Sequence, residues 1–401
     1  MLPDLPWKTY DRVICIPSYD EYEYLPTVLD DVTTLQHKPL VMIHNNCRVN
    51  SPKNVLQNNQ QLHTWLLSYQ STSDGHYHLI EYNGIDVLLI DYSHPPRLFA
   101  STEGVGLARH ELGELACLLV QQKIVTHPWM WCTDGDVRLP KNYLDLPNQQ
   151  EGVELMGYVH APAPLELSLY EIGLRYYTMG LQWADSPVAF PTIGSCIVIH
   201  TRTFEKIYGF PKRQAAEDFY LLNKAVKVAP VHYSNTKTLT IRGRPSDRVP
   251  FGTGQGMNTI AEANLQHFLY HPHIFTVLKE WIQVLRSASD DTLIEELATI
   301  VPDYPYFKKL QKVMRQKCPE SQRIRRRFVF FDCFQTMRWV HHLRDNHWPS
   351  IPIEEALRGA SFIDLQCPIE KPSISNLAQW SEAQSAMYQH EKQCRAITFQ
   401  L

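Results

Sequence analysis

The sequence predicts an α/β fold in which a mostly parallel sheet is flanked by helices and followed by a helical C-terminal region. Short apolar runs alternate with amphipathic segments through the first 135 residues, which is the pattern of βαβ units. Polar residues follow directly after these runs, where ligands bind on such sheets. Beyond residue 256 the apolar residues follow helical spacing. We therefore predict two domains, 1–256 and 257–401.

Four apolar runs predict the strands of the first part: Arg12–Pro17, Leu40–His44, Ile85–Asp91 and Trp129–Thr133. Apolar residues at helical spacing between them predict helices at Leu25–Leu35, Val55–Tyr69 and Val105–Leu119. Because strands and helices alternate, we expect parallel pairing of these strands.

The next part mixes both kinds of element. Strands are expected at Val153–His160 and Cys196–His200, and helices at Leu165–Leu181, Phe204–Tyr208 and Glu217–Val228. The stretch Asn235–Gly256 is rich in Gly, Arg, Ser and Thr, and we predict a long functional loop there. After it, one apolar stripe predicts a buried helix face: Ile274, Val277, Leu278, Trp281, Ile282 and Leu285.

Composition excludes several classes of protein. The chain has 401 residues, 44% of them hydrophobic and 20% charged, with a formal net charge of -4. These values are typical of a globular protein and argue against one that mainly binds nucleic acid. Nine scattered cysteines without CxxC spacing argue against a disulfide framework or a cysteine zinc site. No signal peptide or membrane span is apparent, so a soluble cytoplasmic protein is expected.

The first candidate site is Thr133-Asp134-Gly135-Asp136, directly after a predicted strand. Two carboxylates separated by one residue can both face a cation, and oxygen ligands suit Mg²⁺ or Mn²⁺. Such a metal can neutralise the charge of a departing diphosphate. The alternative is a surface turn, because Asp-Gly is a common turn dipeptide.

Two further motifs favour a phosphate or nucleotide ligand. The segment Pro17-Ser18-Tyr19-Asp20-Glu21 follows the first predicted strand, and Gly104-Val105-Gly106-Leu107-Ala108-Arg109 opens a helix. Helix N-termini attract phosphate, and Arg109 adds a guanidinium. The glycines do not form a dinucleotide fingerprint, since the third glycine of GxGxxG is missing. Arg109 could instead be a solvated helix residue.

An acidic pair, Glu217 and Asp218, opens a later helix. Acidic residues in a first helical turn often only complement the helix dipole. A carboxylate at this position could also be the general base for an acceptor hydroxyl.

Taken in order, these motifs resemble the family-2 glycosyltransferases, which have the GT-A fold, a Rossmann-like sheet flanked by helices. The segments that carry the resemblance are PSYDE, IHNNC, GVGLARH, TDGDVRLP, GSCIVIHTRTFEKIYGF and AED, within about residues 11–230. The resemblance implies a hexosyltransferase-type enzyme that moves a sugar from a UDP- or GDP-sugar to a hydroxyl acceptor such as a saccharide, a glycolipid or a small molecule.

The resemblance also implies roles for individual residues. Pro17, Tyr19 and Glu21 would line the nucleotide pocket, with Asn45 nearby and Arg109 approaching the nucleotide or its phosphates. Asp134 and Asp136 would hold Mn²⁺ or Mg²⁺ and, through the metal, the donor. Asp218 would be the base of an inverting reaction, with Glu217 beside it.

Three positions depart from the family pattern. Asp20 stands where Asn is usual, and His110 stands where Asn is common. His44-Asn45-Asn46 replaces the acidic residue that often contacts uracil, so the pattern leaves both UDP and GDP open.

Three more features extend these predictions. Arg242, Arg244 and Arg248 lie within seven residues beside glycines and could close over a diphosphate; an exposed loop is the alternative. His232 is a candidate third metal ligand. The basic residues Arg323, Arg325, Arg326 and Arg327 precede an apolar segment, which could contact the inner face of a membrane peripherally or form a solvated helix face. The helical region 257–401 could serve this surface or the acceptor.

Two other functions fit parts of this pattern. A sugar nucleotidyltransferase also uses an α/β sheet and a metal, but we would expect a Gly-rich basic loop where this sequence has PSYDE. A non-catalytic module could have kept the nucleotide-sugar site without turnover.

Overall fold

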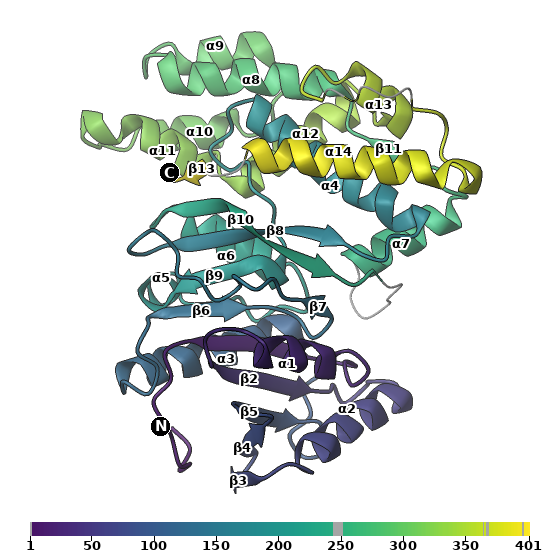
Figure 1. Ribbon diagram of the computed structural model, residues 1–401. Coiled ribbons are helices and arrows are strands. Elements are labelled where there is room, and N and C mark those ends of the chain that lie inside the picture. Colours follow the sequence, from purple (N-terminus) through teal and green to yellow (C-terminus); the bar gives the residue numbers. More distant parts are fainter. Residues whose placement is uncertain (1, 244–251, 364, 366–368, 395–396) are drawn as a thin grey trace. The chain divides into compact units, whose positions relative to one another are not determined.

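The computed structural model describes residues 2–243, 252–363, 365, 369–394 and 397–401. The contacts within the chain define two compact units. The first comprises residues 1–161, 192–242 and 396–398, and the second comprises 162–191, 243–395 and 399–401 (Figure 1). The predicted domains 1–256 and 257–401 stay a prediction.

The first unit is built on one mixed sheet with the strand order β13-β10-β8-β9-β6-β1-β2-β5-β4-β3, in which β13 is Ile397–Phe399. Its central strands β6 (Trp129–Cys132), β1 (Val13–Ser18), β2 (Leu40–Asn46) and β5 (Ile85–Tyr92) are parallel. All four predicted strands of the N-terminal part are therefore present. Their carboxyl ends lie at one edge of the sheet, which is where ligands bind in open α/β sheets.

Antiparallel strands extend this parallel centre on both sides. On one side β4 (Tyr77–Tyr82) pairs with β5, and β3 (Ser71–Asp74) pairs with β4. On the other side β9 (Ile197–His200) lies antiparallel to both β6 and β8 (Val153–His160). The sequence predicted β8 and β9 but not β3, because the four residues of β3 are polar and exposed and show no alternation.

The predicted loop from Asn235 is partly wrong. Strand β10 (Val231–Ile241) continues to Ile241, pairing with β8 and, antiparallel, with β7 (Val137–Arg138). Threonines alternate with apolar residues at its end, which favours a strand with one buried face. At the other end of the predicted loop, helix α7 already begins at Thr253.

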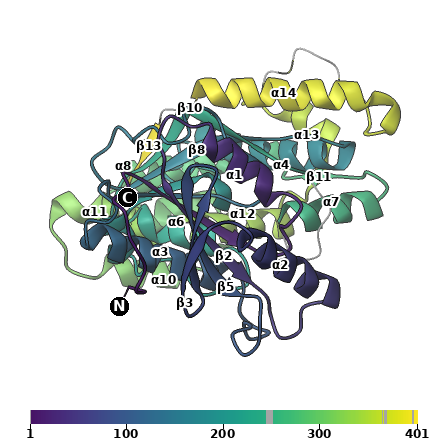
Figure 2. The same ribbon diagram turned by 60° about the horizontal axis from the view of Figure 1, so that its bottom comes forward.

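Helices cover both faces of the central sheet. The crossovers β1-α1-β2 and β2-α2-β5 move along the sheet in one direction, whereas β5-α3-β6 returns. Because such crossovers are right-handed, α1 (Leu25–Thr33) and α2 (Lys53–Leu66) lie on one face and α3 (Val105–Gln121) on the other (Figure 2). These three predicted helices are confirmed, as is α6 (Glu217–Ala225). The helix predicted at Phe204–Tyr208 begins and ends earlier, as α5 (Thr201–Lys206).

The second unit is mainly helical. It contains α4 (Leu165–Trp183), α7 (Thr253–Glu262), α8 (Pro272–Ser287), α9 (Leu293–Ile300), α10 (Phe307–Met314), α11 (Arg323–Phe330), α12 (Cys333–Asn346), α13 (Ile353–Gly359) and α14 (Leu377–Cys394), with a short ladder of β11 (Phe268–Leu269) and β12 (Ile351–Pro352). The predicted apolar stripe of α8 is buried throughout.

Aromatic and ionic contacts stabilise this helical unit. Trp281 of α8 packs against Trp339 of α12 and against Phe331. Between α4 and α14, fully buried Arg175 forms ion pairs with Glu171 and Glu391. A buried guanidinium without any carboxylate partner would be strongly destabilising.

Candidate functional site

The centre of the candidate site is Arg109, a buried residue in the second turn of α3. Its Nη2 atom donates to Oδ1 of Asp134 over 2.6 Å, and its Nη1 atom donates to the carbonyl of Gly194 over 3.0 Å. Its Nε atom lies 3.1 Å from Oε1 of Glu217. Arg109 is therefore not the solvated helix residue that the sequence left open. It joins three segments that are far apart in the chain.

The Asp134-Gly135-Asp136 turn leaves the end of β6 and lies against Glu21, which follows β1. A methyl group on Gly135 would lie 3.0 Å from the side-chain carbons of Glu21, so only glycine allows this approach without a shift. On the other side, the Arg242 N–H donates to the carbonyl of Asp136 over 3.0 Å. The turn thus connects the ends of β1, β6 and β10.

The acidic pair enters the site from the start of α6. Ala216, the N-cap residue, has φ 60°, a left-handed conformation that is unfavourable for alanine. Next to it, Glu217 is buried against Arg109, whereas Asp218 is partly exposed. Asp218 accepts a hydrogen bond from the Phe219 N–H over 2.7 Å.

Gly194 allows its chain segment to approach the side chains of Arg109 and Asp218 closely. A methyl group there would lie 2.7 Å from Nη2 of Arg109 and 3.5 Å from Oδ2 of Asp218. Sequence reasoning quoted this glycine within a longer motif but gave it no role. It opens a short 3-10 turn, Gly194–Cys196, ahead of β9, and nothing in the motif indicates a contact with Arg109.

The carboxyl groups around Arg109 have unusual proton affinities. Burial, reinforced by the neighbouring Asp218, raises the pKa of Glu217 to about 7, although Arg109 acts against the shift. Burial also raises the pKa of Asp218, with the Phe219 N–H acting against it. For Arg109, burial alone would lower the pKa, but Asp134 and Glu217 outweigh it and raise the pKa.

The balance of charge favours a cation as an additional ligand. One guanidinium faces three carboxyl groups, those of Asp134, Glu217 and Asp218. When all three are ionised, the group carries excess negative charge in a poorly solvated place. A proton on Glu217 or a divalent cation would relieve this repulsion. Asp134 and Asp136 offer hard oxygen ligands for such a cation.

The start of α3 has a different role from the one the sequence suggested. The Gly106 N–H donates to the carbonyl of Arg213 over 3.0 Å. A methyl group on Gly106 would lie 2.4 Å from the carbonyl oxygen of Pro211. These glycines admit a neighbouring chain segment, which covers this end of the helix. The expectation of a phosphate site there is therefore wrong, although Arg109 from the same helix belongs to the site.

The predicted nucleotide residues divide into two places. Glu21 lies beside the Asp134 turn, as described above. Pro17 and Asn45 lie on the neighbouring strand ends of β1 and β2, and Asn45 donates to Oδ1 of Asp91 over 3.1 Å. The hydroxyl of Tyr19 lies 3.0 Å from that of Ser51. Their roles in binding a nucleotide stay predictions.

Arg242 is the described member of the predicted arginine group, and its guanidinium lies 4.7 Å from the ring centre of Tyr24. Arg244 and Arg248 lie outside the described residues. His232 contacts Thr398 and lies nine residues before Ile241 on β10. At about 3.3 Å per residue, with a bulge between, it is roughly 20–30 Å from the Asp136 turn. The structure thus does not bring His232 to the predicted metal ligands.

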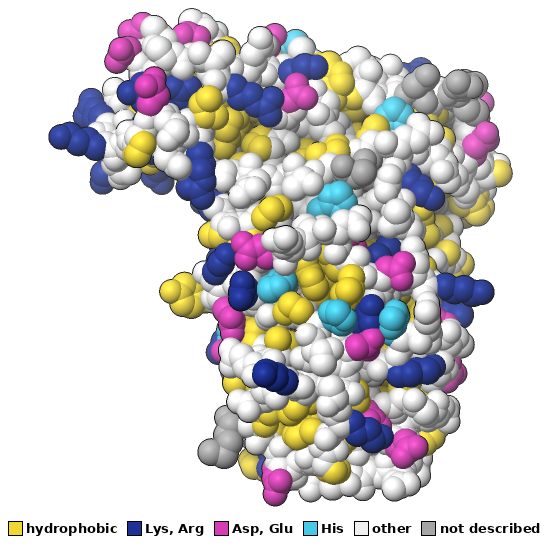
Figure 3. All heavy atoms as spheres, turned by 60° about the vertical axis from the view of Figure 1, so that its left-hand side comes forward, with side chains coloured by type: hydrophobic (Ala, Val, Ile, Leu, Met, Phe, Trp, Pro, Cys, Tyr) yellow, Lys and Arg dark blue, Asp and Glu magenta, His cyan; other side chains and the backbone are white. Residues whose placement is uncertain are grey.

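Two of the basic residues of α11 form hydrogen bonds and ion pairs within the second unit. Arg327 donates to Asp290 over 2.6 Å and to the carbonyl of Leu285 over 3.0 Å, and Arg326 also approaches Asp290. Lys and Arg side chains remain on the surface over α10 and α11 (Figure 3). Membrane contact stays a prediction, and none of the described helices combines the length and apolarity needed to cross a bilayer.

Metal-ligating side chains also gather outside the predicted site. Within the described ranges, groups of three or more occur at His63, Asp91 and His94 and at Asp303, His342 and His347. Sequence reasoning missed both groups. Two members of each group are close in the chain, Asp91 with His94 and His342 with His347, but the third, His63 or Asp303, is distant and joins them only in the fold.

No protein-family model and no curated protein matches the chain. Among solved structures it is similar to TarS 1–349 of S. aureus, with 11% identity over 95% of this chain and 89% of that chain and a TM-score of 0.37. It is also similar to the mannosyltransferase PcManGT from Pyrobaculum calidifontis in complex with GDP-Man and Mn²⁺, with 11% identity, 97% and 90% coverage and a TM-score of 0.33. A third similarity is to the bifunctional glycosyltransferase WbbM, with 10% identity, 78% and 52% coverage and a TM-score of 0.29. Similarities this distant do not assign an activity, which we infer from the site.

Proposed function

We propose that this chain is a metal-dependent, inverting glycosyltransferase of the GT-A type that uses a UDP- or GDP-sugar and a hydroxyl acceptor. The observation that carries the proposal is the convergence of Asp134, Glu217 and Asp218 on buried Arg109. The carboxylates around Arg175 are fully buried, whereas two of those around Arg109, Asp134 and Asp218, remain partly exposed to a ligand. Asp134 directly follows a parallel strand, where ligands bind in such sheets, and this arrangement favours a catalytic site.

In this proposal Asp134 and Asp136 hold Mn²⁺ or Mg²⁺. The Arg109 hydrogen bond occupies Oδ1 of Asp134 and fixes the orientation of the carboxylate, so that Oδ2 can face the cation. When bound, the metal would supply positive charge to the two phosphates of the donor. Arg242, held beside Asp136 by its backbone, is positioned to contact the same phosphates.

Asp218 is the proposed general base. It takes the proton of the acceptor hydroxyl while the acceptor oxygen bonds to the anomeric carbon and the bond from that carbon to the diphosphate breaks. Its raised pKa makes the carboxylate a stronger proton acceptor than an exposed aspartate. Glu217, buried against Arg109, is a positioning residue that keeps the guanidinium in place.

The test is a turnover assay of the purified full chain with a panel of UDP- and GDP-sugars in Mn²⁺. We expect release of a nucleoside diphosphate that EDTA abolishes. Asp136→Asn keeps the shape but removes a charged ligand, and should reduce release by orders of magnitude with little change in Tm. Asp145→Asn, an exposed carboxylate in the same unit, is the matched control and should be fully active.

Other outcomes distinguish the alternatives. Release of pyrophosphate would instead indicate a sugar nucleotidyltransferase. Saturable donor binding without turnover for any acceptor or water would indicate a non-catalytic nucleotide-sugar-binding module. Full activity in EDTA would contradict the metal dependence.

A further inference from the structure

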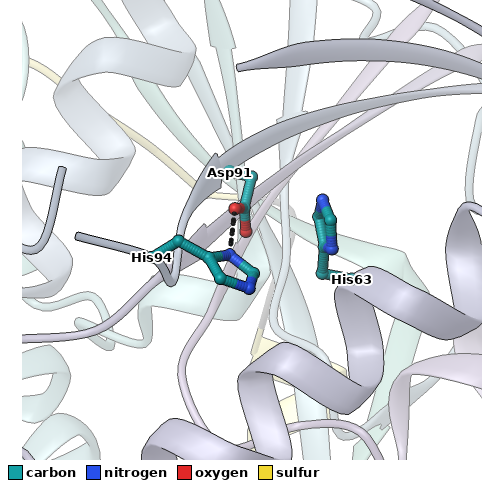
Figure 4. A group of neighbouring side chains, drawn as sticks. All are labelled: His63, Asp91 and His94. Atoms are coloured by element: carbon teal, nitrogen blue, oxygen red, sulfur yellow. Dashed lines mark hydrogen bonds and ion pairs between the residues drawn. The ribbon is translucent and has the colours of Figure 1, made fainter. Parts of the chain in front are cut away.

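A second group of polar side chains lies at the end of β5, away from the Asp134 turn. Asp91 is on β5, His94 follows it, and His63 projects from α2 toward both (Figure 4). One ligand atom from each residue lies within 4.8 Å of the others. The strand order places β5 three positions from β6. At about 4.8 Å per strand, the two groups are roughly 14 Å apart.

The carboxylate of Asp91 is held rigidly in this group. Its Oδ1 atom accepts hydrogen bonds from Ser93 Oγ over 2.7 Å and from Asn45 Nδ2 over 3.1 Å. Its Oδ2 atom lies 2.8 Å from Nδ1 of His94. Asp91 is only 7% exposed, and both donors to Oδ1 are fully buried. Hydrogen bonds of this kind orient the ligands of metal sites and are as much a part of such sites as the ligands.

We propose that His63, Asp91 and His94 bind one transition-metal ion of the Zn²⁺ class. Two imidazoles with one carboxylate suit Zn²⁺ and its neighbours, whereas Mg²⁺ and Ca²⁺ prefer sites made of oxygen alone. Three protein ligands leave a fourth position for water. The side chain of His94 is 43% exposed, so the ion can enter from solvent.

The ion would connect α2 to the end of β5. Helix α2 also carries Asn58 and Asn59, which accept hydrogen bonds from the backbone N–H groups of Tyr22 and Asp20 over 3.1 Å and 2.8 Å. Metal binding therefore fixes the helix that holds the segment after β1. The proposed ion is structural and does not depend on the proposed transfer reaction.

A second His-Asp group provides an internal comparison. Asp303, His342 and His347 lie in the second unit, where Asp303 is 47% exposed. Its side chain is thus far more solvated than that of Asp91. We expect this group to bind Zn²⁺ more weakly, because water competes for an exposed carboxylate and lets it move.

The experiment is a Zn²⁺ titration of the chelator-treated full chain, in which binding is measured by isothermal titration calorimetry. It is performed in the Asp134→Asn, Asp136→Asn background, so that the proposed donor site does not contribute. We expect one tight equivalent of Zn²⁺. His63→Gln and His94→Gln should each weaken its binding at least about 10-fold, the scale on which even supporting residues matter. Co²⁺ should give visible d–d absorption that the same variants abolish.

Two further variants make the result decisive. His37→Gln removes a histidine that pairs with Asp11 in the same unit and should leave the tight equivalent unchanged. His347→Gln tests the second group and should also leave it unchanged. The half-exposed position of His94 makes His94→Gln the safer variant for folding, which circular dichroism checks. Retention of the tight equivalent by folded His94→Gln, or its loss in His347→Gln, overturns the proposal.

Discussion

Two groups of polar side chains at the carboxyl ends of parallel strands in one sheet differ in chemistry. At the end of β6, Asp134 meets Arg109 and two more carboxyl groups. At the end of β5, Asp91 meets His63 and His94. The backbone geometry is the same in both places, since parallel strands bring the residues after them to one edge. The side chains alone therefore decide what each place can bind.

The difference separates two kinds of cation chemistry. Carboxylates around a guanidinium favour a hard cation that arrives with phosphate oxygens, because the protein supplies only part of the coordination shell. Imidazoles around a rigid carboxylate favour a borderline transition metal that the protein holds by itself. We expect the first group to control turnover and the second to control stability.

The largest expected effect is that of Asp218→Asn. If Asp218 is the base, donor binding should survive while turnover falls at least about 100-fold, the scale of general-base catalysis. Single-turnover kinetics together with donor titration separate the two quantities. Asp145→Asn, an exposed carboxylate in the same unit, is the matched control and should keep near-normal turnover in Mn²⁺.

Near-normal turnover of Asp218→Asn would instead mean that the carboxylate only caps α6, since asparagine caps almost as well. A product with retained anomeric configuration would contradict the base assignment as well. Either result would remove the functional contrast between the two groups.

The same comparison shows how far the sequence could predict the molecule. The parallel strands were predictable because each is a short apolar run that is buried along its whole length. The polar hairpin strand β3 was not, since nothing in Ser71–Asp74 alternates. Asp134 and Asp136 could be found because both ligands stand within three residues. The His63, Asp91 and His94 group depends on how α2 packs against the sheet, which local sequence does not specify.

Gly106 illustrates the opposite error. A glycine at a helix start is compatible with a bound phosphate and with a close chain neighbour. Here the neighbour is the backbone at Pro211 and Arg213. Only the tertiary fold decides between these two uses.

The next effect concerns the pH dependence of stability. The pKa of Glu217 is raised from 4.5 to about 7, so the folded state binds this proton more tightly than the unfolded state. The resulting stabilisation is complete below pH 4.5 and is lost as the pH rises through 7. At about 1.36 kcal/mol per pKa unit, the loss between pH 5 and pH 8 is on the order of 2–3 kcal/mol. Glu217→Gln removes it.

Urea unfolding at these two pH values measures the effect. At each pH the free energy of unfolding of the unmodified chain is subtracted from that of Glu217→Gln. This difference should be larger at pH 8 than at pH 5, because only the unmodified chain loses the stabilisation. Asp91→Asn should show no such change between these two pH values, because the pKa of Asp91 is lowered in the fold and its contribution to stability is lost only as the pH falls below 3.8. Equal pH profiles for Glu217→Gln and the unmodified chain would show that Arg109 fully compensates the buried charge.

The smallest expected effect is that of Ala216→Gly, which tests whether the carboxylate site stores backbone strain. Ala216 has φ 60° directly before Glu217, and a left-handed conformation costs a residue with a Cβ about 1–2 kcal/mol. Glycine removes that strain but adds about 0.4–1 kcal/mol of conformational entropy to the unfolded chain. We expect a net gain in stability of up to about 1 kcal/mol.

The matched control is Asn83→Gly, because Asn83 also has positive φ, 47°, in the turn that leads into β5, and asparagine tolerates this conformation. There the entropy acts alone, so Asn83→Gly should be destabilising by about 0.4–1 kcal/mol. The difference between the two variants in urea unfolding is the strain at Ala216. Turnover should fall in Ala216→Gly only, since a freer backbone holds Glu217 and Asp218 less firmly. If both variants lose the same stability, no strain is stored at the carboxylate site, and the two groups at this edge of the sheet differ in their side chains alone.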